Sequence, residues 1–233
     1  MTGETPKDTD PWMKSLDGKY AYAYERSGKL MSELGCSGYP SAALVNASGM
    51  VIWVGHPASI PNNLIQEAIK GALPKPVYEW PASASAAAAA LRKKKYVDAI
   101  AAAAKIPEAD GGPAIKTALE AVVSGKVEGL KSAREKGDIL TAYESAKALQ
   151  KELEGLPQAK EADAIADEIS ADAQAKKIMT AQKRLREIRA QRLGKKNERE
   201  KAIEDLEKMI EGFPDTYLAK EAKSTLNGLK QKK

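Results

Sequence analysis

The spacing of apolar residues changes along the chain and divides it into two parts. Before residue 74 the apolar runs are short: residues 20–24 alternate with period two, and residues 42–45 and 50–54 are separated by Asn-Ala-Ser-Gly. Alternation is typical of strands, and turn residues between two apolar runs indicate a β-hairpin. Residues 59–61 then open an amphipathic helix that reaches Leu73. We also expect short helices from Pro11 to Gly18 and from Ser27 to Gly35.

After residue 85 the apolar residues recur every three or four positions, which predicts helices throughout. The expected helices cover residues 86–105, 114–136, 138–156, 162–173, 178–188, 200–212 and 216–230, and Asp138 is expected to cap the third. Residues 137–172 and 201–230 form two predicted hairpins of about the 34-residue period of tetratricopeptide repeats. Residues 202–222 and 91–104 resemble parts of such repeats, and an irregular helical bundle is the alternative.

Composition supports the division. Residues 1–80 hold eight of the 12 aromatic side chains and a net charge of -1, whereas residues 81–233 carry 30 basic and 24 acidic side chains. Prolines and small residues fill the stretch between them. We therefore expect an α/β domain at 1–73, a Pro/Ala/Ser linker at 74–85 and an all-α domain of stacked helical hairpins at 86–233.

The candidate chemistry is sparse. Cys36 is the single cysteine and His56 the single histidine, which excludes an intramolecular disulfide, a CxxC pair and a multi-cysteine zinc site. His56 is expected to serve a surface or capping role. No metal, cofactor or catalytic residue is predicted. No apolar run is long enough to span a membrane, and the polar start carries no signal peptide.

The stretch from Leu34 to Pro57, with Gly38-Tyr39-Pro40 before the hairpin and Gly55-His56-Pro57 after it, resembles the TlpA/redoxin-type thioredoxin-like proteins. The resemblance covers about residues 1–73, the C-terminal part of that fold. It implies that Pro40 is a cis-proline and that Tyr39 presents its backbone to a substrate or partner. The family's CxxC motif would lie upstream of everything here. Cys36 stands where the family has valine, so it is either a small core residue or an accessory thiol.

Half of a thioredoxin-like sheet would leave a central strand with an open, apolar edge. The chain is then part of a longer parent, or its sheet is completed by a second copy or another segment, or the helices cover it. We favour the longer parent. The compartment follows from this choice: cytoplasmic if Met1 is the true start, periplasmic or secreted if a signal peptide precedes it.

Two functions remain. The first is a thioredoxin-like thiol–disulfide protein that lacks its CxxC and is inactive as this chain. The second is a protein-binding scaffold that acts through the helical hairpins, and self-association through the sheet edge is one form of partner binding. The segment 183–201 has nine basic and three acidic residues but no aromatic residues between them. A solvated helix face explains it better than a nucleic-acid site.

Overall fold

The structure, a computed structural model, describes residues 4–17, 23–25, 27–28, 30–31, 34, 36, 38–47, 49–72, 75–191, 193 and 195–231. Within these residues the chain is mostly helical, with one small antiparallel sheet of two strands. The elements in chain order are α1 (Pro6–Ser15), β1 (Ala42–Val45), β2 (Val51–Gly55), α3 (Asn62–Ala68), α4 (Ser85–Arg92), α5 (Tyr96–Ala103), α6 (Gly112–Lys136), α7 (Ile139–Glu152), α8 (Pro157–Ala171), α9 (Ala173–Ala190), α10 (Lys196–Gly212) and α11 (Tyr217–Gln231).

The predicted β-hairpin is confirmed. β1 and β2 pair antiparallel with Leu44 opposite Trp53, and a bulge follows Leu44. The turn forms because the Asn46 side-chain oxygen accepts a hydrogen bond from the Met50 backbone N–H at 2.9 Å, and Gly49 adopts a left-handed φ of 86°. The predicted helix after the hairpin is also present, as α3, which packs against both strands.

Two predictions before the hairpin fall largely outside the described residues. Of the strand expected at 20–24, the structure describes only residues 23 and 24, and Tyr24 forms an isolated bridge. Of the helix expected to follow Ser27, residues 30 and 31 are helical, and the Leu34 N–H donates to the Leu30 carbonyl at 3.0 Å. The first helix was predicted to begin at Pro11, which is wrong: α1 begins at Pro6, and Pro11 lies inside it.

The single helix expected over residues 86–105 is also wrong. The chain folds back as the hairpin α4–α5, with a turn in which Lys94 has a left-handed φ of 57°. The turn buries Ala87 and Ala99 to 1% and 0% exposure between the two helices. Because residues 91–104 straddle this turn, they are not the first helix of a tetratricopeptide unit. Nothing local marks the break, since alanine favours a continuous helix and neither glycine nor proline interrupts it.

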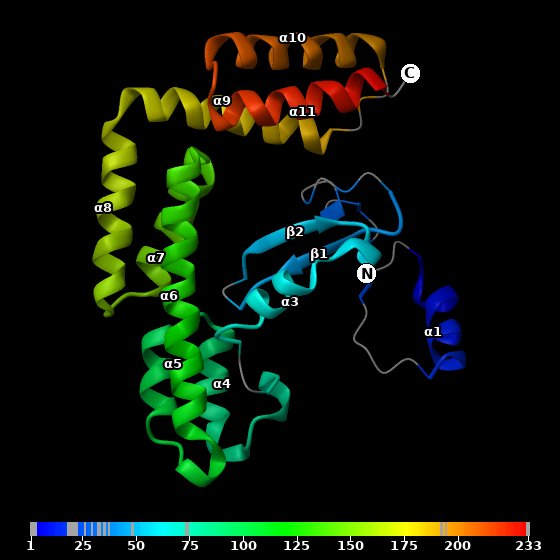
Figure 1. Ribbon diagram of the computed structural model, residues 1–233. Coiled ribbons are helices and arrows are strands. Elements are labelled where there is room, and N and C mark those ends of the chain that lie inside the picture. Colours follow the sequence, from blue (N-terminus) through cyan, green and yellow to red (C-terminus); the bar gives the residue numbers. More distant parts are fainter. Residues whose placement is uncertain are drawn as a thin grey trace.

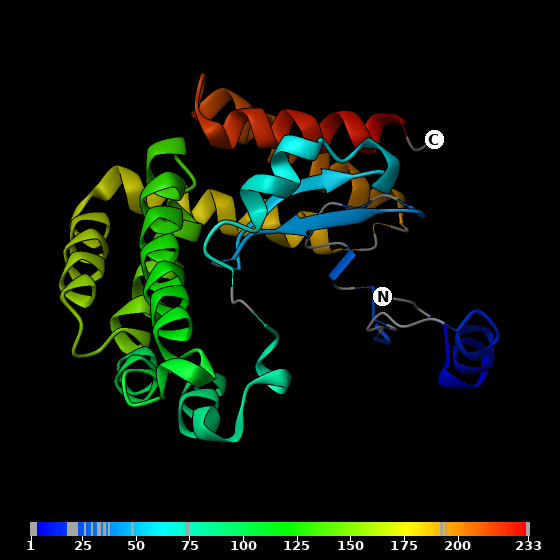
Figure 2. The same cartoon turned by 60° about the horizontal axis from the view of Figure 1, so that its bottom comes forward.

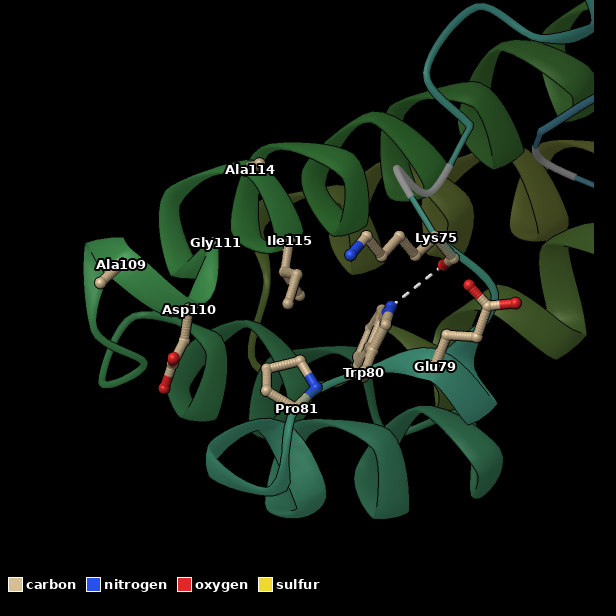
Figure 3. A pocket seen from close by; sticks show the side chains of 9 residues that line it. All are labelled: Lys75, Glu79, Trp80, Pro81, Ala109, Asp110, Gly111, Ala114 and Ile115. Carbon is tan, nitrogen blue, oxygen red and sulfur yellow. Dashed lines mark hydrogen bonds between the residues drawn. The ribbon is translucent and has the colours of Figure 1, made fainter.

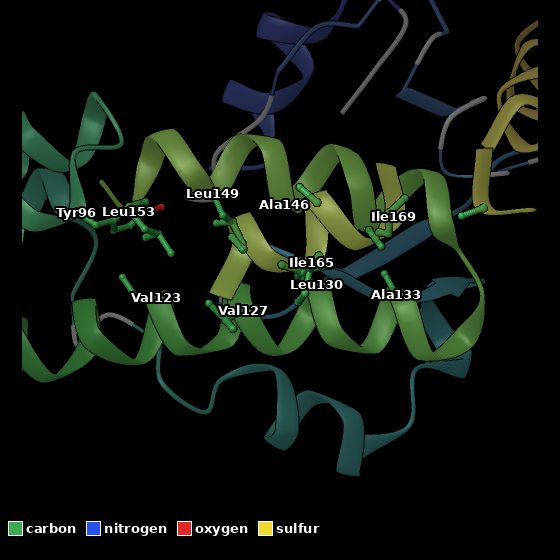
Figure 4. Close-up of a cluster of buried hydrophobic side chains, with 14 residues drawn as sticks. Tyr96, Val123, Val127, Leu130, Ala133, Ala146, Leu149, Leu153, Ile165 and Ile169 are labelled. Atoms are coloured by element: carbon green, nitrogen blue, oxygen red, sulfur yellow. The ribbon is translucent and has the colours of Figure 1, made fainter. Parts of the chain in front are cut away.

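The remaining helices pack around three clusters of buried side chains. Figure 4 shows the largest, where Val127 and Leu130 of α6 point toward Leu149 of α7 and Ile165 of α8. α9–α11 lie across the end of the α6–α8 group (Figure 1), and α10 and α11 form the predicted C-terminal hairpin. α7 and α8 form the other predicted hairpin, and the Asp138 carboxylate accepts from the Thr141 N–H, as expected of a cap.

The hairpin and α3 lie beside α6 (Figure 2), and close approaches at Gly71 and Gly129 show where the two parts meet. A Cβ atom at Gly71 would lie only 3.0 Å from the Ala121 Cβ, and one at Gly129 would lie 3.1 Å from the Met50 Cγ. Small residues on both elements therefore allow the α/β part to sit close to the longest helix. This contact leaves three valines of the sheet exposed: Val45, Val51 and Val54.

Candidate functional site

Large hydrophobic side chains that are exposed occur, among the described residues, in one part of the molecule. Among the described residues, every large hydrophobic side chain that is strongly exposed precedes residue 79: Trp12, Leu16, Tyr39, Val45, Val51, Val54, Ile65, Ile69 and Tyr78. All three buried clusters, by contrast, are built from residues after 79. The helical part thus buries its large apolar residues, whereas the α/β part leaves many of its own exposed. Contiguous exposed apolar residues mark interaction surfaces, so the α/β part is the place to look for one.

The strand register shows which face of the hairpin is exposed. Val45 lies opposite Val51, and Ala43 lies opposite Val54, so these four side chains share one face. We call this set the hairpin face. Its three valines are 49%, 44% and 38% exposed. Leu44 and Trp53 belong to the other face and are only partly exposed, from which we infer that α3 covers that side.

Within the described residues, the edges of the sheet also lack a partner strand, since no third strand pairs with β1 or β2. Neither strand contains a charged residue or a proline, the usual devices that keep an edge strand from pairing with another chain. A sheet of two strands is marginal alone in water. The hairpin thus offers both backbone hydrogen-bonding groups and an apolar face to a further strand.

The residues singled out by the resemblance lie at the start of this surface. Tyr39 is 73% exposed, and its peptide bond to Pro40 is cis. The Ser41 hydroxyl donates to the Gly38 carbonyl and closes the turn that leads into β1. Cys36 is half-buried and free, and its backbone N–H donates to the Met31 carbonyl at 2.9 Å. Tyr39 and Pro40 therefore lie just before β1, one of the two strands that carry the hairpin face.

His56 acts as a cap, as predicted. Its Nδ1 accepts a hydrogen bond from the Ala58 N–H at 3.2 Å and begins the short 3-10 turn Pro57–Ser59. This contact fixes how the chain leaves β2.

A cavity of about 400 Å³ lies where the linker meets α6 (Figure 3). Trp80 and Pro81 form one wall, and Ile115 of α6 points toward them. The Trp80 indole N–H donates to the Lys75 carbonyl at 3.1 Å, which holds the ring in place. The lining of the cavity contains one lysine and two carboxylates, and these groups do not converge on one point where a ligand could bind. The cavity is therefore best explained as a result of linker packing.

The basic segment 183–201 is used within the protein. Arg184 pairs with Asp205, Arg186 with Glu144, and Arg189 with Glu221. Arg199 donates to the Leu229 carbonyl. These four arginines tie α9 and α10 to neighbouring helices, so part of the positive charge of this segment serves the fold.

Sequence reasoning missed one ionic cluster. Glu152, whose side chain is 12% exposed, accepts hydrogen bonds from Lys94 at 3.0 Å and from Lys126 at 3.1 Å. The Lys126 ammonium also lies 5.5 Å from the centre of the Tyr96 ring. The cluster joins the α4–α5 turn, α6 and α7. Its members are up to 58 residues apart, so no local pattern could reveal it.

Replacing Glu152 with Gln should destabilise the protein by about 1–2 kcal/mol at pH 7, because two ammonium groups lose their charged partner. Burial alone would raise the pKa of Glu152, but the hydrogen bonds from Lys94 and Lys126 hold that pKa below its ordinary value. The stability from this carboxylate is therefore complete above the unfolded-state value of about 4.3 and is lost as the pH falls through the lower folded value.

Urea unfolding at a series of pH values checks this prediction. The difference between the wild type and E152Q should shrink at acidic pH. The matched control is E154Q, since the described residues include no ion-pair partner for Glu154. An equal effect of both substitutions, or a difference independent of pH, would contradict the assignment.

Within the described residues, no helix combines the length and apolarity needed to cross a membrane, and no group of three or more metal-ligating side chains gathers. Scans against protein-family models, curated proteins and solved structures gave no match to this chain.

Proposed function

We propose that this protein is a protein-interaction scaffold whose hairpin face and sheet edge bind an extended segment of another polypeptide. The observation that carries the proposal is that, among the described residues, all exposed large hydrophobic side chains precede residue 79. The helical hairpins provide a rigid support, because their own apolar residues are packed in three clusters.

The chemistry of the surface favours an extended strand as the partner. A sheet edge presents unpaired backbone N–H and C=O groups in a row, and only another strand satisfies them in sequence. The valines of the hairpin face would cover alternate apolar side chains of the added strand. A helix or a small ligand would leave the edge groups unpaired.

The proposal includes a finer assignment. We take the α/β part as thioredoxin-like and the C-terminal hairpins as tetratricopeptide-like. The order of Pro40, hairpin and α3 supports the former, and the antiparallel pairs α7–α8 and α10–α11 support the latter. With one cysteine in its sequence, this chain cannot by itself exchange an intramolecular disulfide. Binding, rather than redox catalysis, is therefore the function we assign to it.

Peptide display against the purified chain tests the proposal. We expect enrichment of extended peptides with alternating apolar residues, and bound peptide should slow amide hydrogen exchange within residues 42–55. The double variant Val51→Lys, Val54→Lys should weaken peptide binding at least tenfold, since it places charges where apolar contacts form. Both sites are exposed, so the fold should tolerate the change.

Two further variants distinguish the effect of added charge from the effect of lost apolar surface. Tyr78→Lys adds the same type of charge at an exposed aromatic residue outside the hairpin, and binding should be unchanged. Val51→Thr, Val54→Thr keeps β-branched residues but removes apolar surface, and binding should weaken. Sedimentation shows whether the bound strand comes from a second copy, in which case the lysine variant abolishes the dimer. Failure to enrich any peptide, or binding that the lysine variant does not alter, would refute the proposal.

A further inference from the structure

A second surface, unconnected with the hairpin face, gathers positive charge around a cavity. The cavity has a volume of about 600 Å³ and lies between the α4–α5 turn and the C-terminal half of α7. Five of its lining residues are lysines: Lys93, Lys94, Lys95, Lys147 and Lys151. We call this the lysine pocket.

The carboxylates of the lysine pocket do not balance these charges. Glu152 is shared between Lys94 and Lys126, and Asp98 lies 3.8 Å from Lys95. Glu154 is the third acidic residue of the lining. With Lys126, which pairs with Glu152 from outside the lining, six ammonium groups share three carboxylates. Among the described residues, no ion-pair partner exists for the three remaining lysines: Lys93, Lys147 and Lys151.

Two features of this arrangement are unfavourable for the fold itself. Lys147 and Lys151 are four residues apart on one helix face, a spacing at which like charges repel. Lys94 occupies a left-handed position at which glycine would be less costly. The negative ends of α4 and α7 favour a lysine at each helix end separately. The helix dipoles do not explain why lysines from both helix ends line the same cavity. Binding of an anionic ligand would explain it.

We propose that the lysine pocket binds the phosphate chain of a small polyphosphate. Lysine ammonium groups are compact charges with rotatable donors, suited to a phosphate chain whose oxygens point in several directions. The lining contains no arginine, the residue favoured for bidentate capture of a carboxylate. Its aromatic residue, Tyr96, is 5% exposed and lies near Lys126, so it offers no free face on which a base could stack. The pocket therefore contacts only the phosphate groups of its ligand.

Calorimetric titration of the full chain with inorganic tripolyphosphate tests this site. We expect one bound anion per chain, weaker binding of pyrophosphate, and affinity that falls as salt is raised. ATP should bind within about threefold of tripolyphosphate because the base adds no contact. The double variant Lys147→Gln, Lys151→Gln should lower the affinity for tripolyphosphate at least tenfold, with an unchanged circular dichroism spectrum.

The matched control is Lys220→Gln, Lys223→Gln on α11, which removes the same charge from exposed lysines away from the pocket. Its affinity should stay within twofold of the wild type. If both double variants lost the same affinity for tripolyphosphate, the anion would be attracted by the net charge of the protein, and the proposed site would be refuted. Absence of binding at millimolar tripolyphosphate would do the same. An ATP affinity more than tenfold above that of tripolyphosphate would overturn the assigned ligand class.

Discussion

Replacing Gln182 with Met should destabilise the protein by about 2–4 kcal/mol, because a buried side chain that makes two hydrogen bonds becomes apolar. Gln182 is 6% exposed and lies on α9. Its Oε1 accepts from the Leu140 N–H at 2.8 Å, and its Nε2 donates to the Gly137 carbonyl at 2.8 Å. Both backbone groups belong to helix ends, where the helix itself supplies no partner. Met fills a similar volume and leaves both groups unsatisfied.

The position of Gln182 makes this effect larger than the loss of an ordinary cap. The N-terminal half of α9 contributes Ala175 to the largest cluster, and the C-terminal half contributes Leu185 and Ile188 to the cluster with α10 and α11. Gln182 lies between them and ties α9 to the turn between α6 and α7. The substitution should therefore loosen the connection between the two groups of helices.

Urea unfolding followed by circular dichroism measures the change. Gln174→Met is the matched control, since this glutamine is exposed on the same helix. It should alter the free energy of unfolding by less than about 0.5 kcal/mol. If Q182M were as stable as Q174M, water or neighbouring groups would have to satisfy Leu140 and Gly137, and the bridging role would be refuted. Amide exchange at Leu140 offers a second readout, which should accelerate in Q182M.

Local sequence patterns predicted those helices and strands whose ends are marked by turn or capping residues. The hairpin follows from turn residues at 46–49, and α6 and α7 follow from helical spacing with Gly137 and Asp138 between them. The α4–α5 turn has no such signal. Its left-handed residue is Lys94, and the alanines around it fit one long helix as well as two short ones. Tertiary packing decided between them.

The candidate sites depended even more on long-range contacts. Alternation in β1 and β2 indicates two faces, but only the packing of α3 determines which of them stays exposed. The lysine pocket combines residues about 50 positions apart, none of which forms a motif. Conversely, the basic segment 183–201 is prominent in the sequence but is engaged in ion pairs such as that of Arg189 with Glu221. Charge along a chain thus predicts a site poorly until the partners of each charge are known.

The α4–α5 hairpin itself leads to the second prediction. Ala99→Leu should destabilise the protein by about 2–3 kcal/mol, since a larger side chain must separate two closely packed helices. Ala99 is 0% exposed and lies in a cluster with Ala84, Ala87 and Ala103. Leucine and alanine have similar helix propensities, so the effect would come from packing and not from the helix itself.

Ala101→Leu on the same helix is the control, because Ala101 is exposed. Thermal unfolding of the two variants distinguishes the hairpin from one continuous helix over residues 86–105. In the hairpin only Ala99→Leu lowers the melting temperature. In a continuous helix α4 would not fold back over α5, and the two substitutions would differ little. Equal melting temperatures would therefore refute the turn at Lys94, and with it the lysine pocket that this turn helps to form.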